Sequence, residues 1–233
     1  QKSFFAQDSD LLELKDVIKG ADLFLGLSGP NILSPNMILS MKQKPIIFAL
    51  ANPNPEITPK EAYAVRPDAI LATGRTDYPN QVNNVLCFPY LFRGALDCGA
   101  TAINDDMKMA CVTALAELAH AESDERVVEA YGGQDLKFGP DYIIPKPFDP
   151  RLLVELAPAV ARAAMASGIA SRPIDDFEAY RQKLLDFVFR SGTVMKPVFD
   201  QAKRDPRRVV YAEGESRRVL RAVQNALDEG IVR

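Results

Sequence analysis

Histidine and cysteine, the side chains that most often bind transition metals or serve as nucleophiles, are scarce in this sequence. It has one histidine and three cysteines in 233 residues. His120 ends an Ala/Leu-rich helical segment, and nothing near it in the sequence supplies a metal partner or a nucleophile. Cys87, Cys98 and Cys111 form no C-x-x-C pair, so we expect them to be small buried core side chains. An odd number of unpatterned cysteines is typical of a reducing, cytoplasmic compartment.

An excess of basic charge and a long apolar run are missing as well. The sequence has 28 Lys and Arg residues against 31 Asp and Glu residues, so no basic surface for nucleic acid is predicted. No apolar run approaches the roughly 20 residues that a membrane-spanning helix needs. Residues 1–10 lack the basic and apolar regions of a signal peptide. We therefore expect a globular protein without a nucleic-acid or membrane partner.

Strand and helix signals alternate through the first half of the chain. The strand signals are short apolar runs that end in polar turns, at residues 21–27, 46–51 and 69–73. Helical spacing precedes the first run at residues 9–19. Ser34 and Thr58, each followed by proline, are typical helix starts between the runs. The order β-α-β-α-β predicts an α/β fold with the second half of a doubly wound, Rossmann-like parallel sheet.

The glycine-rich loop G-x-G-x-x-G, with which such a domain usually begins, does not occur. The nearest glycine pair, Gly26 and Gly29, has no third glycine and follows the wrong strand. The sequence also begins without methionine, in the middle of what we interpret as a folded unit. We therefore expect a fragment of a longer chain, without the first half of the nucleotide-binding domain.

Helical patterns dominate after Asn83. Pro89 should kink or restart a helix over residues 85–96. A helix over residues 104–119 is predicted to bury a stripe of four apolar side chains, Met109, Val112, Leu115 and Leu118 or Ala119. The charged run at 121–129 is predicted to be a solvated face, and residues 142–150 an extended connector before a helix over 151–167.

Residues 171–173 are a plausible domain boundary. An amphipathic helix is predicted at 176–190, a strand within 207–216 and a helix over 216–230. One strand and one helix cannot enclose a core, so a second α/β domain is expected to begin near Asp205.

Neutral amide side chains stand directly after two of the predicted strands. Asn52 follows the second strand between two prolines, and Asn80, Asn83 and Asn84 follow the third strand and open a helix. Ligands of an open parallel sheet lie outside the carboxyl ends of its strands. Because amides donate and accept hydrogen bonds but transfer no proton, we expect a site that orients a ligand. The alternatives are an Asx turn at Asn52 and a helix N-cap among the later asparagines, one of which could also help to hold an anion.

Long strings of this sequence resemble the cofactor domain of bacterial malic enzymes. Over about residues 1–170 they are ADLFLGLS, IFALANPNPEI, ATGRTDYPNQVNNVLCFPYLFRGALDCGATAIN, YIIPKPFDPRL and APAVARAAMASGIA. Residues 171–233, with FVFRSGTVMKPVF and RVVYAEGESRRVLRAVQNALDEG, look like a linker helix and the start of a phosphate-acetyltransferase-like domain. The resemblance thus implies the large, two-part type of malic enzyme that uses NADP.

The resemblance implies an oxidoreductase that decarboxylates L-malate to pyruvate and CO2 and reduces NADP (or NAD). The family also uses Mg or Mn, a lysine base and a tyrosine acid, all held by residues that map before Gln1. We therefore expect this chain to contain no catalytic residue and no metal ligand, and to be inactive alone.

Five residues match family positions that touch ligands. Asn52 and Asn84 are implied to contact malate, and Asn52 and Asn83 to contact the nicotinamide. Ser28 and Gly29 match the turn over which the cofactor passes.

The C-terminal part carries the alternative function. The resemblance implies that it senses acetyl-CoA and supports a homo-oligomer, so the chain could be a non-catalytic regulatory or assembly module. Two arginine pairs, at 207–208 and 217–218, could contact phosphate or CoA, although a solvated rim near the strand is the simpler interpretation.

Overall fold

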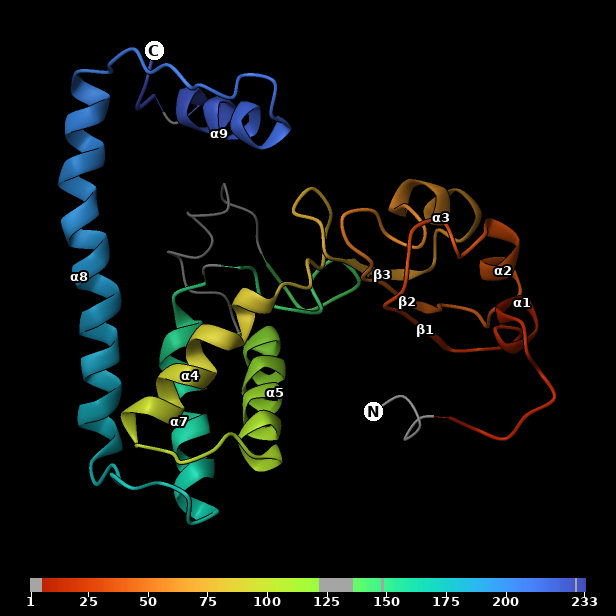
Figure 1. The fold of residues 1–233 in the computed structure, drawn as a ribbon, viewed down its shortest axis with the longest axis horizontal. Helices are drawn as coiled ribbons and strands as arrows, with labels where there is room; N and C mark the ends of the chain where they lie inside the picture. The colour runs from red at the N-terminus through yellow and green to blue at the C-terminus, as the bar shows by residue number, and fades with distance from the viewer. Residues whose placement is uncertain (1–5, 122–135, 148, 229) are drawn as a thin grey trace. The chain divides into compact units, whose positions relative to one another are not determined.

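The computed structural model of the chain (Figure 1) describes residues 6–121, 136–147, 149–228 and 230–233. They fall into two compact units that divide between Asp175 and Asp176. The first unit holds a parallel sheet and the helices that follow it. The second holds α8, Phe177–Arg204, and α9, Arg217–Asp228. No helix in the described residues is long and apolar enough to cross a membrane.

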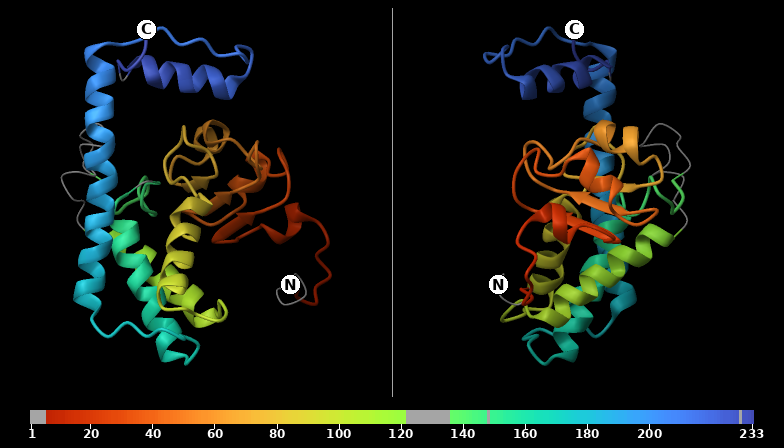
Figure 2. Two further views of the ribbon diagram at one scale, coloured as in Figure 1. Left: turned by 60° about the vertical axis from the view of Figure 1, so that its left-hand side comes forward. Right: turned by 90° about the vertical axis from the view of Figure 1, so that its right-hand side faces the viewer.

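Three parallel strands in the order β1-β2-β3 form the sheet, visible from two sides in Figure 2. They are β1 (Leu23–Gly26), β2 (Ile46–Ala49) and β3 (Ile70–Thr73). The helix α2 (Pro35–Leu39) joins β1 to β2, and α3 (Pro59–Val65) joins β2 to β3. The structure therefore confirms the predicted β-α-β-α-β order and the α/β class.

Two short helices begin where the sequence predicts. The Ser34 hydroxyl accepts the Met37 N–H at the start of α2. At the start of α3, Thr58 Oγ1 accepts the Glu61 N–H, and Glu61 Oε2 accepts the Thr58 N–H at 3.1 Å. Each cap satisfies backbone donors that have no partner within the helix. The first predicted helix is much shorter than residues 9–19: α1 spans Leu14–Val17, and Leu12 before it is 91% exposed. With no core contact at Leu12, helical spacing alone does not hold that segment in a helix.

The core of the sheet lies on the face that α2 and α3 cover. Its fully buried members include Ile38 of α2, Ile47 of β2 and Ala62 of α3. On the opposite face, Leu23 and Leu25 of β1 are 49% and 53% exposed. The described residues thus cover this sheet on one face and leave an apolar strip on the other.

Helices α4, α5 and α7 pack together after the sheet (Figure 1). A 3-10 turn, η2 (Asn84–Leu86), leads into α4 (Phe88–Asp97), so Pro89 restarts the helix as predicted. The other two are α5 (Asp105–His120) and α7 (Arg151–Ala166). Gly94 permits the close approach of α4 to α7, because a Cβ there would lie 2.4 Å from the Ala157 carbonyl oxygen.

The predicted buried stripe of α5 is wrong at Met109 and Val112, which are 60% and 56% exposed, and right at Leu118 and Ala119. The buried face consists of Met107, Cys111, Ala114, Leu118 and Ala119. Side chains spaced strictly three residues apart shift by about 60° around the helix at each step. Side chains spaced alternately four and three residues apart stay on one face. Of the charged run predicted at 121–129, only Ala121 belongs to the described residues.

The predicted strand within 207–216 is also wrong. Only Arg207 pairs, in an isolated bridge with Val232, and Val210 is 94% exposed. A strand needs a neighbour for its backbone hydrogen bonds, and the described residues provide one bridge. The predicted helices on either side do form, and α8 runs well past the expected end at residue 190.

A buried carboxylate joins the carboxyl ends of β1 and β2. Glu56 is fully buried, its Oε1 accepts the Ser28 N–H and its Oε2 accepts the Ala51 N–H, each at 3.1 Å. Ser28 follows β1 and Ala51 follows β2, so one side chain fixes both strand exits. Gly26 makes room for it, because a Cβ at this position would lie 2.4 Å from the Glu56 carboxyl carbon. We call Glu56, Gly26 and the two amides the Glu56 clamp.

We expect Glu56→Gln to lower the free energy of unfolding by about 1–3 kcal/mol, because the amide NH2 of glutamine cannot accept the second backbone N–H. Urea unfolding followed by circular dichroism measures this difference. An unchanged midpoint would show that neither backbone amide depends on the carboxylate.

Gly26→Ala tests the packing of the same clamp. We expect a loss of about 1–3 kcal/mol from overpacking against the carboxylate. Gly29→Ala is the matched control, since the nearest atom to its Cβ would be an ordinary 3.6 Å away. In a Glu56→Ala background the obstructing side chain is gone, so the cost of Gly26→Ala should shrink. Equal costs in the two backgrounds would contradict the predicted contact.

Candidate functional site

The strand exits that precede the predicted polar residues lie at one edge of the sheet. Ala49 of β2 pairs with Thr73 of β3, so both strands end at the same edge. The Glu56 clamp holds the exits of β1 and β2 together, and thereby brings the turn at Ser28 and Gly29 to the same edge as Asn52. No hydrogen bond between described residues links these positions to Asn83 or Asn84.

Asn52 and Asn84 present free amides. Both side chains are exposed, and neither has a hydrogen-bond partner among the described residues. The Asx turn that was the alternative for Asn52 is therefore not observed there. The Asn52-Pro53 peptide bond is cis. Each amide can donate two hydrogen bonds and accept others from a ligand.

Asn83 is the helix N-cap that the sequence predicted at one of three asparagines. Its Oδ1 accepts the Val85 N–H at 3.0 Å and so caps η2, and the amide NH2 of the exposed side chain points to no described acceptor. The turn that it caps spans Asn84–Leu86 only. Such a short helix has a weak dipole, so an anion at Asn84 would depend on the side-chain amide itself.

Asn80 is buried, and its side chain holds two segments of the chain together. It is 2% exposed, with a left-handed backbone at φ 55°, a conformation that asparagine tolerates better than most residues. Its Nδ2 donates to the carbonyl oxygens of Leu71 at 2.8 Å and Pro140 at 2.6 Å. Its Oδ1 accepts the Ile143 N–H at 2.9 Å. One amide thus joins β3 to the segment 136–147.

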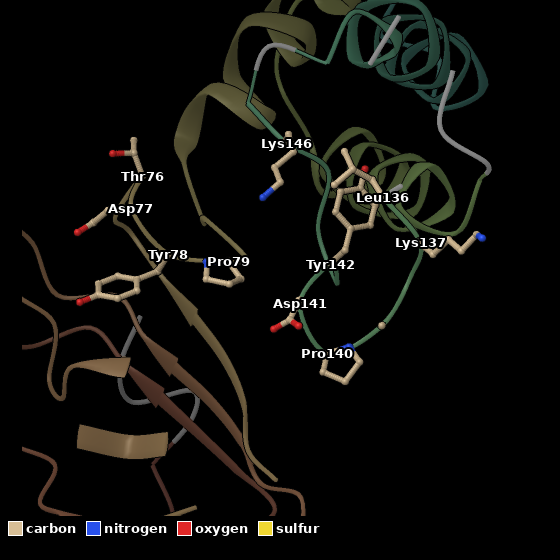
Figure 3. A pocket seen from close by; sticks show the side chains of 11 residues that line it. Thr76, Asp77, Tyr78, Pro79, Leu136, Lys137, Pro140, Asp141, Tyr142 and Lys146 are labelled. Atoms are coloured by element: carbon tan, nitrogen blue, oxygen red, sulfur yellow. The ribbon is translucent and has the colours of Figure 1, made fainter. Parts of the chain in front are cut away.

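A cavity of about 770 Å³ lies between the two segments that Asn80 joins (Figure 3). One wall comes from the loop after β3 and the other from the segment before α7. The lining residues are Thr76, Asp77, Tyr78, Pro79, Leu136, Lys137, Gly139, Pro140, Asp141, Tyr142 and Lys146. None of the five predicted ligand residues lines it. Sequence reasoning missed this wall, because the segment was predicted only to connect two helices.

One charged side chain of this cavity, Asp77, is held by an arginine outside it. Asp77 forms an ion pair with Arg75 at 2.6 Å, and the Arg75 guanidinium lies 5.5 Å from the centre of the Tyr78 ring. Burial, and to a lesser extent the charge of Asp141, raise the pKa of Tyr63. The described residues contain no group of three or more His, Cys, Asp or Glu side chains that could hold a metal ion. The exposed amides and this cavity therefore support binding and orientation of a ligand.

Two family models match the sequence. Residues 1–129 match the family "Malic enzyme, NAD binding domain", and residues 193–233 match "Phosphate acetyl/butaryl transferase". The NADP-dependent malic enzyme of Salmonella typhimurium is 61% identical over 99% of this chain, and that of Escherichia coli is 62% identical over 94%. The NAD-dependent malic enzyme of Rhizobium meliloti is 59% identical over 98% of this chain. The chain spans about 30% of the length of these relatives.

Solved structures agree with the sequence matches. The malic enzyme of Pyrococcus horikoshii superposes with a TM-score of 0.64 at 34% identity, over 79% of this chain and 39% of that one. The malic enzyme of Entamoeba histolytica gives a TM-score of 0.65 at 35% identity, over 80% and 36%. The match over residues 1–129 covers more than half of the sequence, and so this chain belongs to the malic enzyme family through its NAD-binding domain.

Proposed function

We propose that this chain orients L-malate and the nicotinamide of NADP for oxidative decarboxylation to pyruvate and CO2. The observation that carries the proposal is the pair of exposed amides, Asn52 and Asn84, which have no partner among the described residues and follow β2 and β3. Relatives 61% and 62% identical bear the name NADP-dependent malic enzyme, which supports this assignment.

Neutral amides suit this role for an electrostatic reason. An amide NH2 donates to a malate carboxylate without adding a second charge to the site, and the amide oxygen accepts the carboxamide NH2 of the nicotinamide. A hydrogen bond to a charged partner contributes about 1.5–3 kcal/mol. The prolines around Asn52 and the Glu56 clamp restrict its loop, so little conformational freedom is lost when a ligand binds.

When bound, NADP would supply the acceptor for the hydride of malate C2. The residues that would hold it are Ser28 and Gly29 at the turn after β1, with Asn52 and Asn83 beside the nicotinamide. Gly29 is half-buried and the Ser28 N–H is engaged by Glu56, so the turn offers a fixed surface over which an extended cofactor can pass.

Mg or Mn does not fit the described residues, which contain no cluster of three possible ligands. We propose that the metal, the base and the acid belong to other parts of the full-length protein. No step of the reaction is assigned to a metal bound by this chain.

The choice between NADP and NAD is not decided by similarity, because relatives of both kinds are close to 60% identical. The order of the two family matches does not separate them either, since the NAD-dependent relative aligns over 98% of this chain. We propose NADP because the relatives from Salmonella typhimurium, Escherichia coli and Haemophilus influenzae bear that name. The proposed domain boundaries are 1–170 for the cofactor domain and 171–233 for the linker helix and the second domain. A reducing, cytoplasmic compartment stays a prediction from the cysteine pattern.

A regulatory or assembly module is the second candidate function. The match of residues 193–233 to a phosphate acetyl/butaryl transferase favours it. In that case the C-terminal part would bind acetyl-CoA and support a homo-oligomer, and the exposed amides would have no ligand.

We expect Asn84→Ala in the full-length protein to raise the malate KM or lower kcat at least tenfold, which corresponds to about 1.4 kcal/mol of lost binding. Steady-state kinetics at saturating NADP measure both constants. Asn54→Ala, an exposed amide in the Asn52 loop that no ligand position matches, is the control and should change neither constant. Wild-type kinetics for Asn84→Ala would remove Asn84 from the site.

Saturation binding of NADP to this chain separates the two candidate functions. We expect saturable binding that weakens in Asn52→Ala, together with no malate-dependent formation of NADPH by the chain alone. Calorimetry and absorbance at the NADPH band are the two measurements. Absence of NADP binding, with acetyl-CoA binding retained, would favour the regulatory module.

A further inference from the structure

Two cysteines that are 24 positions apart in the sequence meet in the structure. The Sγ atoms of Cys87 and Cys111 lie 3.3 Å apart. Cys87 is the residue between η2 and α4, and Cys111 lies on the buried face of α5. The sequence predicted inert core side chains, because nothing in the spacing of the two residues indicates that they touch.

The surroundings give the two thiols different reactivity. Cys87 is half-buried and Cys111 is buried. The hydrogen bond from the Cys111 thiol lowers the pKa of Cys87 to about 7, and the same contact, with burial, raises the pKa of Cys111. The thiolate is the nucleophile in disulfide exchange, so Cys87 is the attacking group and Cys111 the resolving one.

We propose that Cys87 and Cys111 form an oxidisable dithiol site whose co-reactant is a small disulfide of the glutathione class. The Cys87 thiolate attacks one sulfur of the disulfide RSSR and releases RS⁻, which takes up a proton. The Cys111 sulfur, losing its proton, then attacks the Cys87 sulfur of the mixed disulfide and releases the second RS⁻. Two protein thiols are oxidised and one RSSR is reduced to two RSH.

The geometry requires little movement to form this bond. A disulfide joins its sulfur atoms at about 2.05 Å, so the observed 3.3 Å must shorten by about 1.3 Å. Cys98 provides an internal contrast. It is fully buried, its Sγ lies 3.5 Å from the Ala95 carbonyl oxygen, and burial raises the pKa of its thiol.

Oxidation would act on the turn that carries Asn84. The Cys87 N–H donates to the Asn84 carbonyl oxygen at 3.1 Å, and the Cys87 carbonyl oxygen accepts the Leu91 N–H at 2.9 Å. A shift of Cys87 toward α5 therefore moves the end of η2 and the start of α4 together. This consequence for malate binding rests on the proposed function, whereas the chemistry of the thiol pair does not.

The test treats the native full-length protein with glutathione disulfide and maps the products by proteolysis and mass spectrometry. We expect one internal disulfide between Cys87 and Cys111 with Cys98 left as a free thiol, and an increase in malate KM of at least about threefold that dithiothreitol reverses. Cys87→Ser and Cys111→Ser should lose this response to the oxidant, and the matched Cys98→Ala should keep it.

Several outcomes overturn the proposal. Three free thiols at these positions after treatment, a lasting mixed disulfide on Cys87, or a disulfide that includes Cys98 would each reject the dithiol site. A Cys87–Cys111 disulfide with unchanged malate KM, in a protein that Asn84→Ala disables, would reject the coupling to the site. If the protein does not oxidise malate at all, the proposed function fails while the mapped disulfide still decides the thiol chemistry.

Discussion

The hydrogen bonds of the Glu56 carboxylate are the constraint on which the ligand edge of this sheet depends. Parallel strands pair along their length, but nothing in that pairing fixes the loops after their carboxyl ends. Here one buried side chain accepts the Ser28 N–H after β1 and the Ala51 N–H after β2. A buried carboxylate is tolerated only when such donors compensate for the lost water. The same interaction that satisfies Glu56 therefore fixes the turn at Ser28 at the sheet edge from which the Asn52 loop leaves.

A second buried polar side chain, Asn80, fixes the loop after β3. Asn80 uses both atoms of its amide to join Leu71 to Pro140 and Ile143. The hydrogen bonds of Glu56 and Asn80 fix the chain near the strand exits. The exposed side-chain amides of Asn52 and Asn84 have no partner among the described residues. Under the proposed function, these neutral donors would orient a ligand and leave its proton chemistry to other residues. The chain spans about 30% of the length of its malic enzyme relatives.

Sequence reasoning succeeded where the signal is local. Caps at Ser34 and Thr58, the apolar runs of the strands and the restart at Pro89 depend on near neighbours, and all of them are confirmed. The rule that ligand residues follow parallel strands pointed to Asn52 and Asn84, whose side chains are exposed, and their contact with a ligand stays a prediction.

Features that depend on distant partners could not be predicted. Nothing near Glu56 in the sequence indicates that its carboxylate will accept the Ser28 N–H, 28 residues away. Asn80 likewise bonds to Pro140 and Ile143, 60 and 63 residues further along the chain. The strand predicted within 207–216 is wrong because it lacks a partner strand. Its composition is typical of a strand, but among the described residues only Arg207 pairs, in one bridge. The contact between Cys87 and Cys111 likewise follows from the packing of α4 beside α5, which no spacing encodes.

Hydrogen–deuterium exchange at single-residue resolution tests the central claim most directly. Ser28 and Ala51 lie outside the strands, so without the carboxylate their amides would exchange as fast as other loop amides. The Glu56 clamp predicts exchange as slow as that of the β2 backbone for both, and a joint acceleration in Glu56→Gln. Fast exchange of both amides in the unmodified protein would contradict the account.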